Sequence, residues 1–192
     1  KKELLFNCLF LLFLGCVTSL SLPPFNHFII NFFTFTSIFI FLFKKLEIHQ
    51  NKKLFFLYGW LFGFGYFLSS LYWISISLTF DEKFKFLIPL SLFFIPAFLA
   101  IFFGLISYFF SIFKPKGIVY SFFVFSLIFG ILEFIRGSVL TGFPWNLIAY
   151  SFSSQLKLIS ITSIIGTYGL NLLCISLFTC PAILILKRSK KE

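Results

Sequence analysis

Six long apolar stretches, separated by short charged loops, make up nearly the whole of this 192-residue chain. The mean hydropathy of +1.03 lies far outside the range of a water-soluble domain, and only 11% of the residues are charged. A bilayer cannot hydrogen-bond exposed peptide groups, so apolar stretches of this length can cross it only as helices. The sequence therefore predicts an all-α fold, a polytopic membrane bundle of six transmembrane helices.

The predicted spans cover residues 4–22, 28–43, 54–80, 86–113, 118–135 and 158–186. A helix needs about 20 residues to cross a bilayer. By that measure the second span is short, while the third, fourth and sixth are long enough to tilt, kink or protrude. Pro89 and Pro96 predict a bend in the fourth span, because proline lacks a backbone donor and clashes with the preceding turn.

Lysine and arginine are distributed unevenly between the two sets of loops. With the amino terminus inside, twelve of them lie on the cytoplasmic side, whereas Lys83, Lys85, Arg136 and Lys157 lie outside. This bias obeys the positive-inside rule at every loop, so we predict that both termini are cytoplasmic. If the short second stretch did not cross, the later basic loops would change sides, and the bias therefore favours six crossings over five.

The composition also excludes several classes of function. A chain this poor in polar residues is not a nucleic-acid-binding protein, and its net charge of +10 reports membrane topology instead. Cys8, Cys16, Cys174 and Cys180 lie inside apolar stretches, with no Cys-x-x-Cys spacing and no nearby histidine. We interpret them as small buried hydrophobic side chains and expect no metal site, no disulfide framework and no cofactor.

The most unusual polar feature is the pair Glu133 and Arg136 at the end of the fifth span. Their i, i+3 spacing places both side chains on one face of a helix. An ionisable pair at membrane depth is costly, so it is either mutually neutralising or functional. The simpler interpretation is a stabilising anchor at the outer end of the helix, and the alternative is contact with a lipid headgroup.

The segment after this pair alternates apolar residues with turn formers. Gly142 permits sharp backbone geometry, Pro144 stiffens the chain, and Phe143 and Trp145 can sink into the headgroup boundary. We interpret residues 137–146 as a loop that dips into the membrane surface. An ordinary aromatic belt is the alternative.

A band of small residues runs along the third span. Gly59 and Gly63 form a small-xxx-small pair, and Gly65 continues the band. Such a band lets helices approach closely, so we interpret it as a packing face. The polar aromatic residues of the same span are interpreted as interface anchors and not as a ligand cage: Trp60, Tyr66, Tyr72 and Trp73.

The run Glu133-Phe134-Ile135-Arg136-Gly137, continuing through Leu140-Thr141-Gly142-Phe143-Pro144-Trp145 to Tyr150-Ser151, resembles the signature of bacterial apolipoprotein N-acyltransferases. Further landmarks occur in the same order: Pro23-Pro24-Phe25-Asn26, Gly63-Phe64-Gly65 with Tyr72-Trp73, and Gly166-Thr167-Tyr168-Gly169-Leu170-Asn171. The resemblance covers essentially the whole chain.

The resemblance implies a bacterial inner-membrane enzyme that transfers an acyl chain from a phospholipid to the N-terminal diacylglyceryl-cysteine of a lipoprotein. In that family a nitrilase-like domain carries a Glu, a Lys and a Cys, and the Cys forms a thioester with the acyl group. Because the sequence stops just after the sixth span, we expect this domain to be missing. We therefore expect no catalytic residue in this fragment and no activity on its own. A separate nitrilase-like polypeptide is then a possible partner.

What the resemblance transfers is a lipid-facing role for six residues, which are the predicted substrate-binding residues: Glu133, Arg136, Gly142, Phe143, Pro144 and Trp145. They would either orient the donor phospholipid or brace the catalytic domain. Two other classes of function stay open, a small lipid or solute transporter and a non-catalytic membrane scaffold. Against a transporter, the ion pair lies near one edge of the membrane and not near the midplane.

Overall fold

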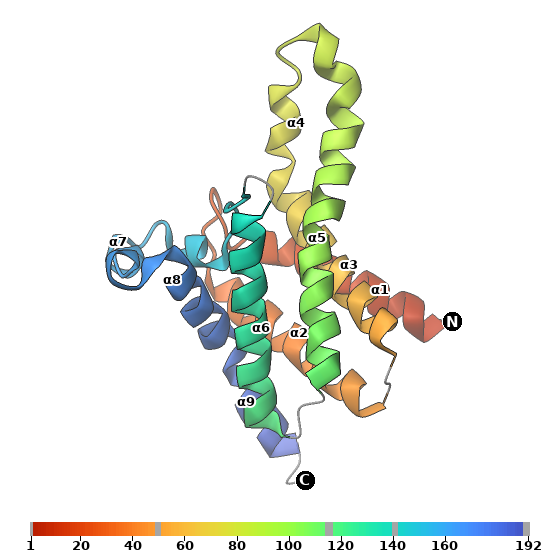
Figure 1. The fold of residues 1–192 in the computed structure, drawn as a ribbon, viewed down its shortest axis with the longest axis vertical. Helices are drawn as coiled ribbons and strands as arrows, with labels where there is room; N and C mark the ends of the chain where they lie inside the picture. Colours follow the sequence, from red (N-terminus) through yellow and green to blue (C-terminus); the bar gives the residue numbers. More distant parts are fainter. Residues whose placement is uncertain (1, 49–50, 114–116, 140–141, 190–192) are drawn as a thin grey trace.

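The computed structural model describes residues 2–48, 51–113, 117–139 and 142–189, and every regular element in these ranges is helical (Figure 1). The longer helices are α1 (Lys2–Ser19), α2 (Ile29–Ile48), α3 (Lys52–Leu71), α5 (Ile88–Phe113), α6 (Ile118–Ser138) and α8 (Thr162–Thr179). The shorter elements are α4 (Trp73–Ser77), α7 (Leu156–Ile159), α9 (Pro181–Ser189) and the 3-10 helices η1 (Glu82–Leu87) and η2 (Ile148–Phe152). The predicted all-α fold is confirmed.

Within the described ranges, 6 helical segments are long and apolar enough to cross a membrane, as the sequence predicted. They cover Lys2–Ser19, Ile29–Ile48, Lys52–Leu71, Glu82–Phe113, Ile118–Ser138 and Thr162–Arg188. In the fourth, Pro89 lies in the first turn of α5, where a missing N–H group leaves no helical bond unmade. Pro96 lies inside the helix, so the predicted bend concerns Pro96 alone.

The second span is longer than predicted, because α2 continues past Phe43 to Ile48. Two interactions accommodate Lys45, one of the two lysines that end the apolar run. The Nζ atom of Lys45 donates to Oε1 of Glu3 in α1 at 2.7 Å, and it lies 5.7 Å from the centre of the Phe41 ring. With its charge paired, Lys45 can remain in the helix, and the 20 residues of α2 reach the length of a full span.

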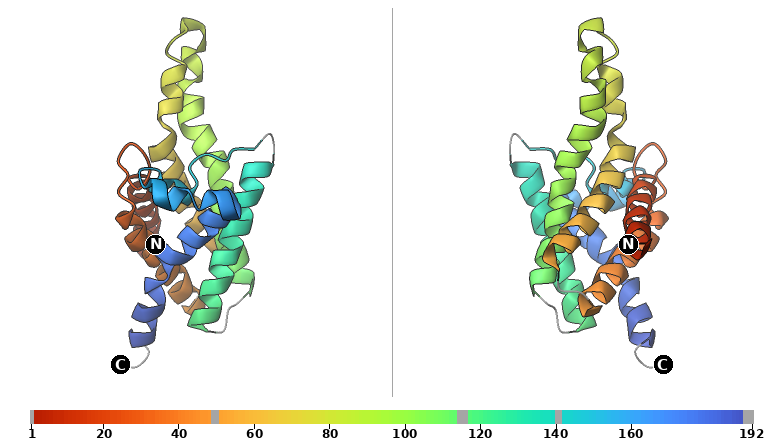
Figure 2. Two further views of the ribbon diagram at one scale, coloured as in Figure 1. Left: turned by 90° about the vertical axis from the view of Figure 1, so that its left-hand side faces the viewer. Right: turned by 90° about the vertical axis from the view of Figure 1, so that its right-hand side faces the viewer.

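The third predicted span is divided into two helices. α3 ends at Leu71, and α4 covers Trp73–Ser77. Together α4, η1 and the first turns of α5 form a hairpin that extends beyond the other helices (Figure 1, Figure 2). The long third and fourth apolar stretches therefore do protrude.

The sixth predicted span is also discontinuous. Gly166 has φ 73° and ψ 167°, a conformation that is essentially restricted to glycine, and it interrupts α8. A further short helix begins at Pro181, whose ring cannot continue a preceding helical hydrogen-bond ladder. The span thus consists of consecutive helical pieces and not of one straight helix.

The small residues of α3 allow close contact on two sides. A Cβ atom at Gly65 would lie 2.2 Å from the carbonyl oxygen of Leu12 in α1, and one at Gly59 would lie 2.2 Å from that of Phe103 in α5. The most extensive helix packing accordingly joins α3 to α5 and to α1. The interpretation of this band as a packing face is confirmed.

One end of the bundle contains the last turns of α1, α3 and α6 and the first turn of α2 (Figure 1). We call it the loop end. Polar and aromatic contacts join its connecting segments. The hydroxyl of Ser153 donates to Oδ1 of Asn26 at 3.2 Å, and the rings of Phe28 and Phe152 lie 5.2 Å apart. Segments far apart in the sequence therefore meet here, and the predicted site residues lie among them.

Candidate functional site

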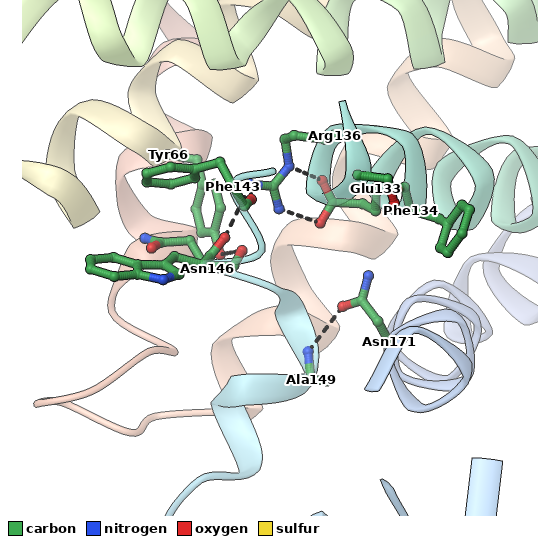
Figure 3. Close-up of polar contacts among 10 residues, drawn as sticks. Tyr66, Glu133, Phe134, Arg136, Phe143, Asn146, Ala149 and Asn171 are labelled. Carbon is green, nitrogen blue, oxygen red and sulfur yellow. Dashed lines mark hydrogen bonds and ion pairs between the residues drawn. The ribbon is translucent and has the colours of Figure 1, made fainter. Parts of the chain in front are cut away.

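The Glu133 and Arg136 side chains form a buried ion pair in the last turns of α6. The helix runs past its predicted end at residue 135 to Ser138, so Arg136 is part of it. Nε of Arg136 donates to Oε1 of Glu133 and Nη2 donates to Oε2, each at 2.9 Å (Figure 3). Relative exposure is 0% for Glu133 and 1% for Arg136. This two-pronged geometry is the strongest form of an arginine–carboxylate pair.

The remaining terminal nitrogen of Arg136 holds the segment that follows α6. Nη1 donates to the carbonyl oxygens of Phe143 at 2.9 Å and Trp145 at 3.0 Å. The guanidinium carbon also lies 5.2 Å from the centre of the Phe67 ring in α3, a cation–π contact. Arg136 thus connects α6, α3 and residues 142–146, which we call the aromatic segment.

The backbone of the aromatic segment has two residues with positive φ. Gly142 has φ 77°, and a Cβ atom there would lie 2.4 Å from the carbonyl oxygen of Gly137. Asn146 has φ 58°, and its carbonyl oxygen accepts a hydrogen bond of 2.8 Å from the hydroxyl of Tyr66. Leu140 and Thr141, which also belong to the predicted motif, lie outside the described residues.

The aromatic side chains of this segment turn to different neighbours. Trp145 is 50% exposed and stacks on Trp73 at the start of α4, with ring centres 5.2 Å apart and planes 17° apart. The Phe143 ring lies 5.7 Å from that of Trp145. The stack joins the aromatic segment to the projecting hairpin, a contact that the interface-anchor interpretation of Trp73 did not include.

Three further residues support the site and were not among the predicted ones. Besides Tyr66, Asn171 of α8 accepts through Oδ1 a hydrogen bond of 3.1 Å from the backbone N–H of Ala149. Tyr168 covers Gly137 so closely that a Cβ atom there would lie 1.7 Å from its hydroxyl oxygen. The quoted motif around Gly166 contained Tyr168 and Asn171, whereas nothing in the sequence pointed to Tyr66 as a support for residue 146.

Two hollows lie on either side of the aromatic segment. The loop-end cavity, of about 480 Å³, is bounded by the loop after α1, the end of α3, Trp73 and residues 145–153. The α5 groove, of about 280 Å³, is bounded by one face of α5 together with Arg136, Val139, Gly142 and Phe143. Trp145 faces the first hollow and Phe143 faces the second, so the segment separates them.

None of the cysteines lines either hollow. All four cysteines are free: Cys8 and Cys16 in α1, Cys174 in α8 and Cys180 directly after it. Among the described residues there is no group of three or more His, Cys, Asp or Glu side chains that could hold a metal ion. At the loop end the described residues offer hydrogen bonding and aromatic contact, which suit binding and orientation of a ligand.

Fold and site together define a six-span helical membrane protein in which a buried ion pair holds an aromatic segment at one end. The family model described as apolipoprotein N-acyltransferase N-terminal domain matches residues 14–180. The chain therefore belongs to the apolipoprotein N-acyltransferase family through its N-terminal domain, as the motifs indicated.

Individual relatives agree with this match. The chain is 35% identical over 176 residues to the apolipoprotein N-acyltransferase of Rhizobium etli (strain CIAT 652) and 38% identical over 172 residues to that of Rickettsia prowazekii (strain Madrid E). Each alignment covers 88% of this chain and 33% of the relative. With that of Rickettsia bellii (strain RML369-C) it is 43% identical over 122 residues, 63% of this chain and 24% of the relative. The chain thus spans about a third of the length of the first two relatives.

Proposed function

We propose that this chain forms the membrane part of an apolipoprotein N-acyltransferase, which transfers an acyl chain from a phospholipid to the N-terminal diacylglyceryl-cysteine of a lipoprotein. The name shared by the relatives supports this reaction, and six membrane-capable helices suit a substrate that resides in the bilayer. One observation carries the proposal. Within the motif that resembles the family signature, Arg136 fixes the aromatic segment at the loop end.

In this proposal the six predicted residues have two kinds of role. All three guanidinium nitrogens of Arg136 donate to protein oxygens, which supports a positioning role for Glu133 and Arg136 over direct capture of a headgroup. Gly142 provides the turn that begins the aromatic segment. Phe143, Pro144 and Trp145 then contact the lipid substrates, in agreement with the exposure of Pro144 and Trp145.

The chain would reside in the bacterial inner membrane, with both termini cytoplasmic and the loop end facing outward. A nitrilase-like domain, on the same polypeptide or on a separate one, would supply the acyl-carrying cysteine above the loop end. The projecting hairpin of α4, η1 and α5 stands on that side, which supports such an arrangement (Figure 2).

A chimera tests the proposed reaction. This chain replaces the corresponding N-terminal third of the Rickettsia prowazekii relative, and the product is expressed in bacteria depleted of their own N-acyltransferase. We expect mass spectrometry to detect triacylated lipoprotein N-termini. A chimera that inserts at the level of the parent enzyme and yields only diacylated lipoprotein would contradict the proposal.

A matched pair of tryptophan variants tests the role of the loop end in the same chimera. Trp145→Ala removes the exposed ring and its stack on Trp73, so acylation should fall. Trp60→Ala removes a tryptophan of α3 that lies outside the loop end and donates a hydrogen bond from Nε1 to the carbonyl oxygen of Ala97. Acylation per inserted molecule should therefore persist. Equal loss in both variants would count against a substrate contact at Trp145.

A further inference from the structure

The loop-end cavity is built from four separate parts of the chain. Pro23 and Pro24 come from the loop after α1, Ser69 and Ser70 from the end of α3, Trp73 from α4, and Tyr150 from η2. Its volume of about 480 Å³ lies within the range of about 300–1,000 Å³ that is typical of small-molecule sites. The cavity is therefore large enough to take part of a lipid molecule and not only water.

The polar part of the cavity lining is uncharged. Among the described residues that line it, the polar groups are serine and tyrosine hydroxyls and the Asn146 amide, and none carries a formal charge. Burial raises the pKa of the Tyr150 phenol above its ordinary value, so it remains a neutral hydroxyl at neutral pH. Hydroxyls and amide N–H groups can donate to the carbonyl oxygens of esters, and hydroxyls and amide oxygens can accept from hydroxyl groups.

An uncharged lining is a poor site for a phosphate. Phosphate sites in proteins use arginine, lysine or clusters of N–H groups, and an anion buried without such partners is strongly disfavoured. Arg136 does not line this cavity but borders the α5 groove, and its nitrogens already donate to Glu133, Phe143 and Trp145. The lining therefore selects against the charged headgroup of a phospholipid.

The rest of the wall is aromatic and apolar. The stacked rings of Trp73 and Trp145 form one side, and Leu22 and Phe25 contribute to another. Tryptophan combines an apolar face with one polar N–H group, and it is enriched where acyl chains meet polar groups. A ligand with an uncharged polar centre and apolar tails matches both parts of the lining.

We propose that the loop-end cavity binds the glyceryl ester region of a diacylglyceryl group that carries no phosphate. If the proposed function holds, the source of this group is the acyl acceptor, the diacylglyceryl-cysteine of the lipoprotein. The acyl-donor phospholipid then binds elsewhere. Free diacylglycerol presents the same chemistry and is the second source to be distinguished.

Photolabelling of this chain in nanodiscs tests the binding site without requiring any acyl transfer. The probe is a diacylglycerol with a diazirine near its glyceryl esters, and the labelled peptides are mapped by mass spectrometry. We expect labelling within residues 19–25, 69–73 and 145–153, the three segments that contribute side chains to the cavity lining. A phosphatidylglycerol with the same acyl chains should compete at least about tenfold more weakly than unlabelled diacylglycerol, a difference of about 1.4 kcal/mol. Equal competition would overturn the proposal.

Two variants fill the cavity from different walls. Ser69→Trp on α3 and Ser153→Leu after η2 should each reduce specific labelling at least about tenfold. Ser91→Trp on α5 is the matched control, because Ser91 is a half-buried serine of the neighbouring span that does not line the cavity. Monodisperse elution and an unchanged helical circular dichroism spectrum identify the folded variants. Undiminished labelling in both folded cavity variants would overturn the proposal.

Competition with a synthetic diacylated lipopeptide distinguishes the two sources. Displacement of the probe by the lipopeptide, and not by the same peptide without its acyl chains, supports the acceptor. If diacylglycerol displaces the probe and the diacylated lipopeptide does not, the assignment to the acceptor is overturned. Because labelling is measured on this chain alone, an inactive chimera with intact labelling would reject the proposed reaction and leave the binding site in place.

Discussion

At the scale of single residues, the ion pair of Glu133 and Arg136 is the feature that the sequence located and the structure explains. An i, i+3 pair at the end of an apolar span predicted that the two charges meet. The sequence left open whether the pair anchors the helix or contacts lipid. The hydrogen bonds of Nη1 add a third function, because they fix the carbonyl groups of Phe143 and Trp145.

Arg136→Met should destabilise the folded chain by about 3–5 kcal/mol, because it leaves the Glu133 carboxylate buried without a partner. The double variant Glu133→Leu with Arg136→Met should lose less, since no uncompensated charge remains. Reversible unfolding in mixed micelles measures both. Lys157→Met, at an exposed position of α7, is the control and should stay within about 0.5 kcal/mol of the parent. An Arg136→Met variant as stable as this control would contradict the pairing.

Gly142→Ala should destabilise the aromatic segment for two reasons. The position has φ 77°, and the added Cβ atom would meet the Gly137 carbonyl oxygen at 2.4 Å. We expect the free energy of unfolding to fall by about 1–3 kcal/mol, together with faster proteolysis between α6 and η2. Gly117→Ala is the control, because Gly117 has an extended backbone and nothing lies within 4 Å of an added methyl group. Equal stability of the two variants would show that Gly142 does not constrain the segment.

At the scale of elements, the apolar runs predicted the helices but not their interruptions. Within an apolar run, a glycine in a helix and a glycine that breaks one have the same hydropathy. The lysines near the end of α2 led to the opposite error, because they predicted that the helix ends at Phe43. Lys45 pairs with Glu3 only when α1 packs beside α2, and the helix then continues to Ile48. Helix boundaries in this chain therefore depend on contacts between helices as well as on local composition.

Gly166→Ala separates backbone conformation from packing. Gly166 has the same sign of φ as Gly142, but nothing lies within 4 Å of an added Cβ atom. The substitution should therefore cost about 1–3 kcal/mol through backbone strain alone. Double-variant unfolding with Gly142→Ala should give additive losses if the two turns are independent. A neutral Gly166→Ala variant would indicate that the break in α8 can straighten at little cost.

At the scale of the whole molecule, the membrane orientation stays a prediction from the distribution of lysine and arginine. With both termini cytoplasmic, the loop end faces outward. Trp145→Cys, in a background with the four native cysteines replaced, should react with a membrane-impermeant maleimide in intact cells. Lys52→Cys in the same background, at the opposite end of α3, should react with the maleimide only after the cells are permeabilised. The reverse pattern would overturn the orientation and with it the proposed function.

The sequence by itself determined that the chain folds in a lipid bilayer, that it is helical, how many spans it has, and that a polar pair lies at the end of the fifth span. These follow from hydropathy, span length and the 3.6-residue repeat, which are properties of local sequence. Only the tertiary structure decided what Arg136 holds, that Tyr66 supports Asn146, and that Trp73 and Trp145 close one cavity. Those contacts join residues far apart in the chain, and neither hydropathy nor spacing records which distant groups will complete a buried hydrogen bond.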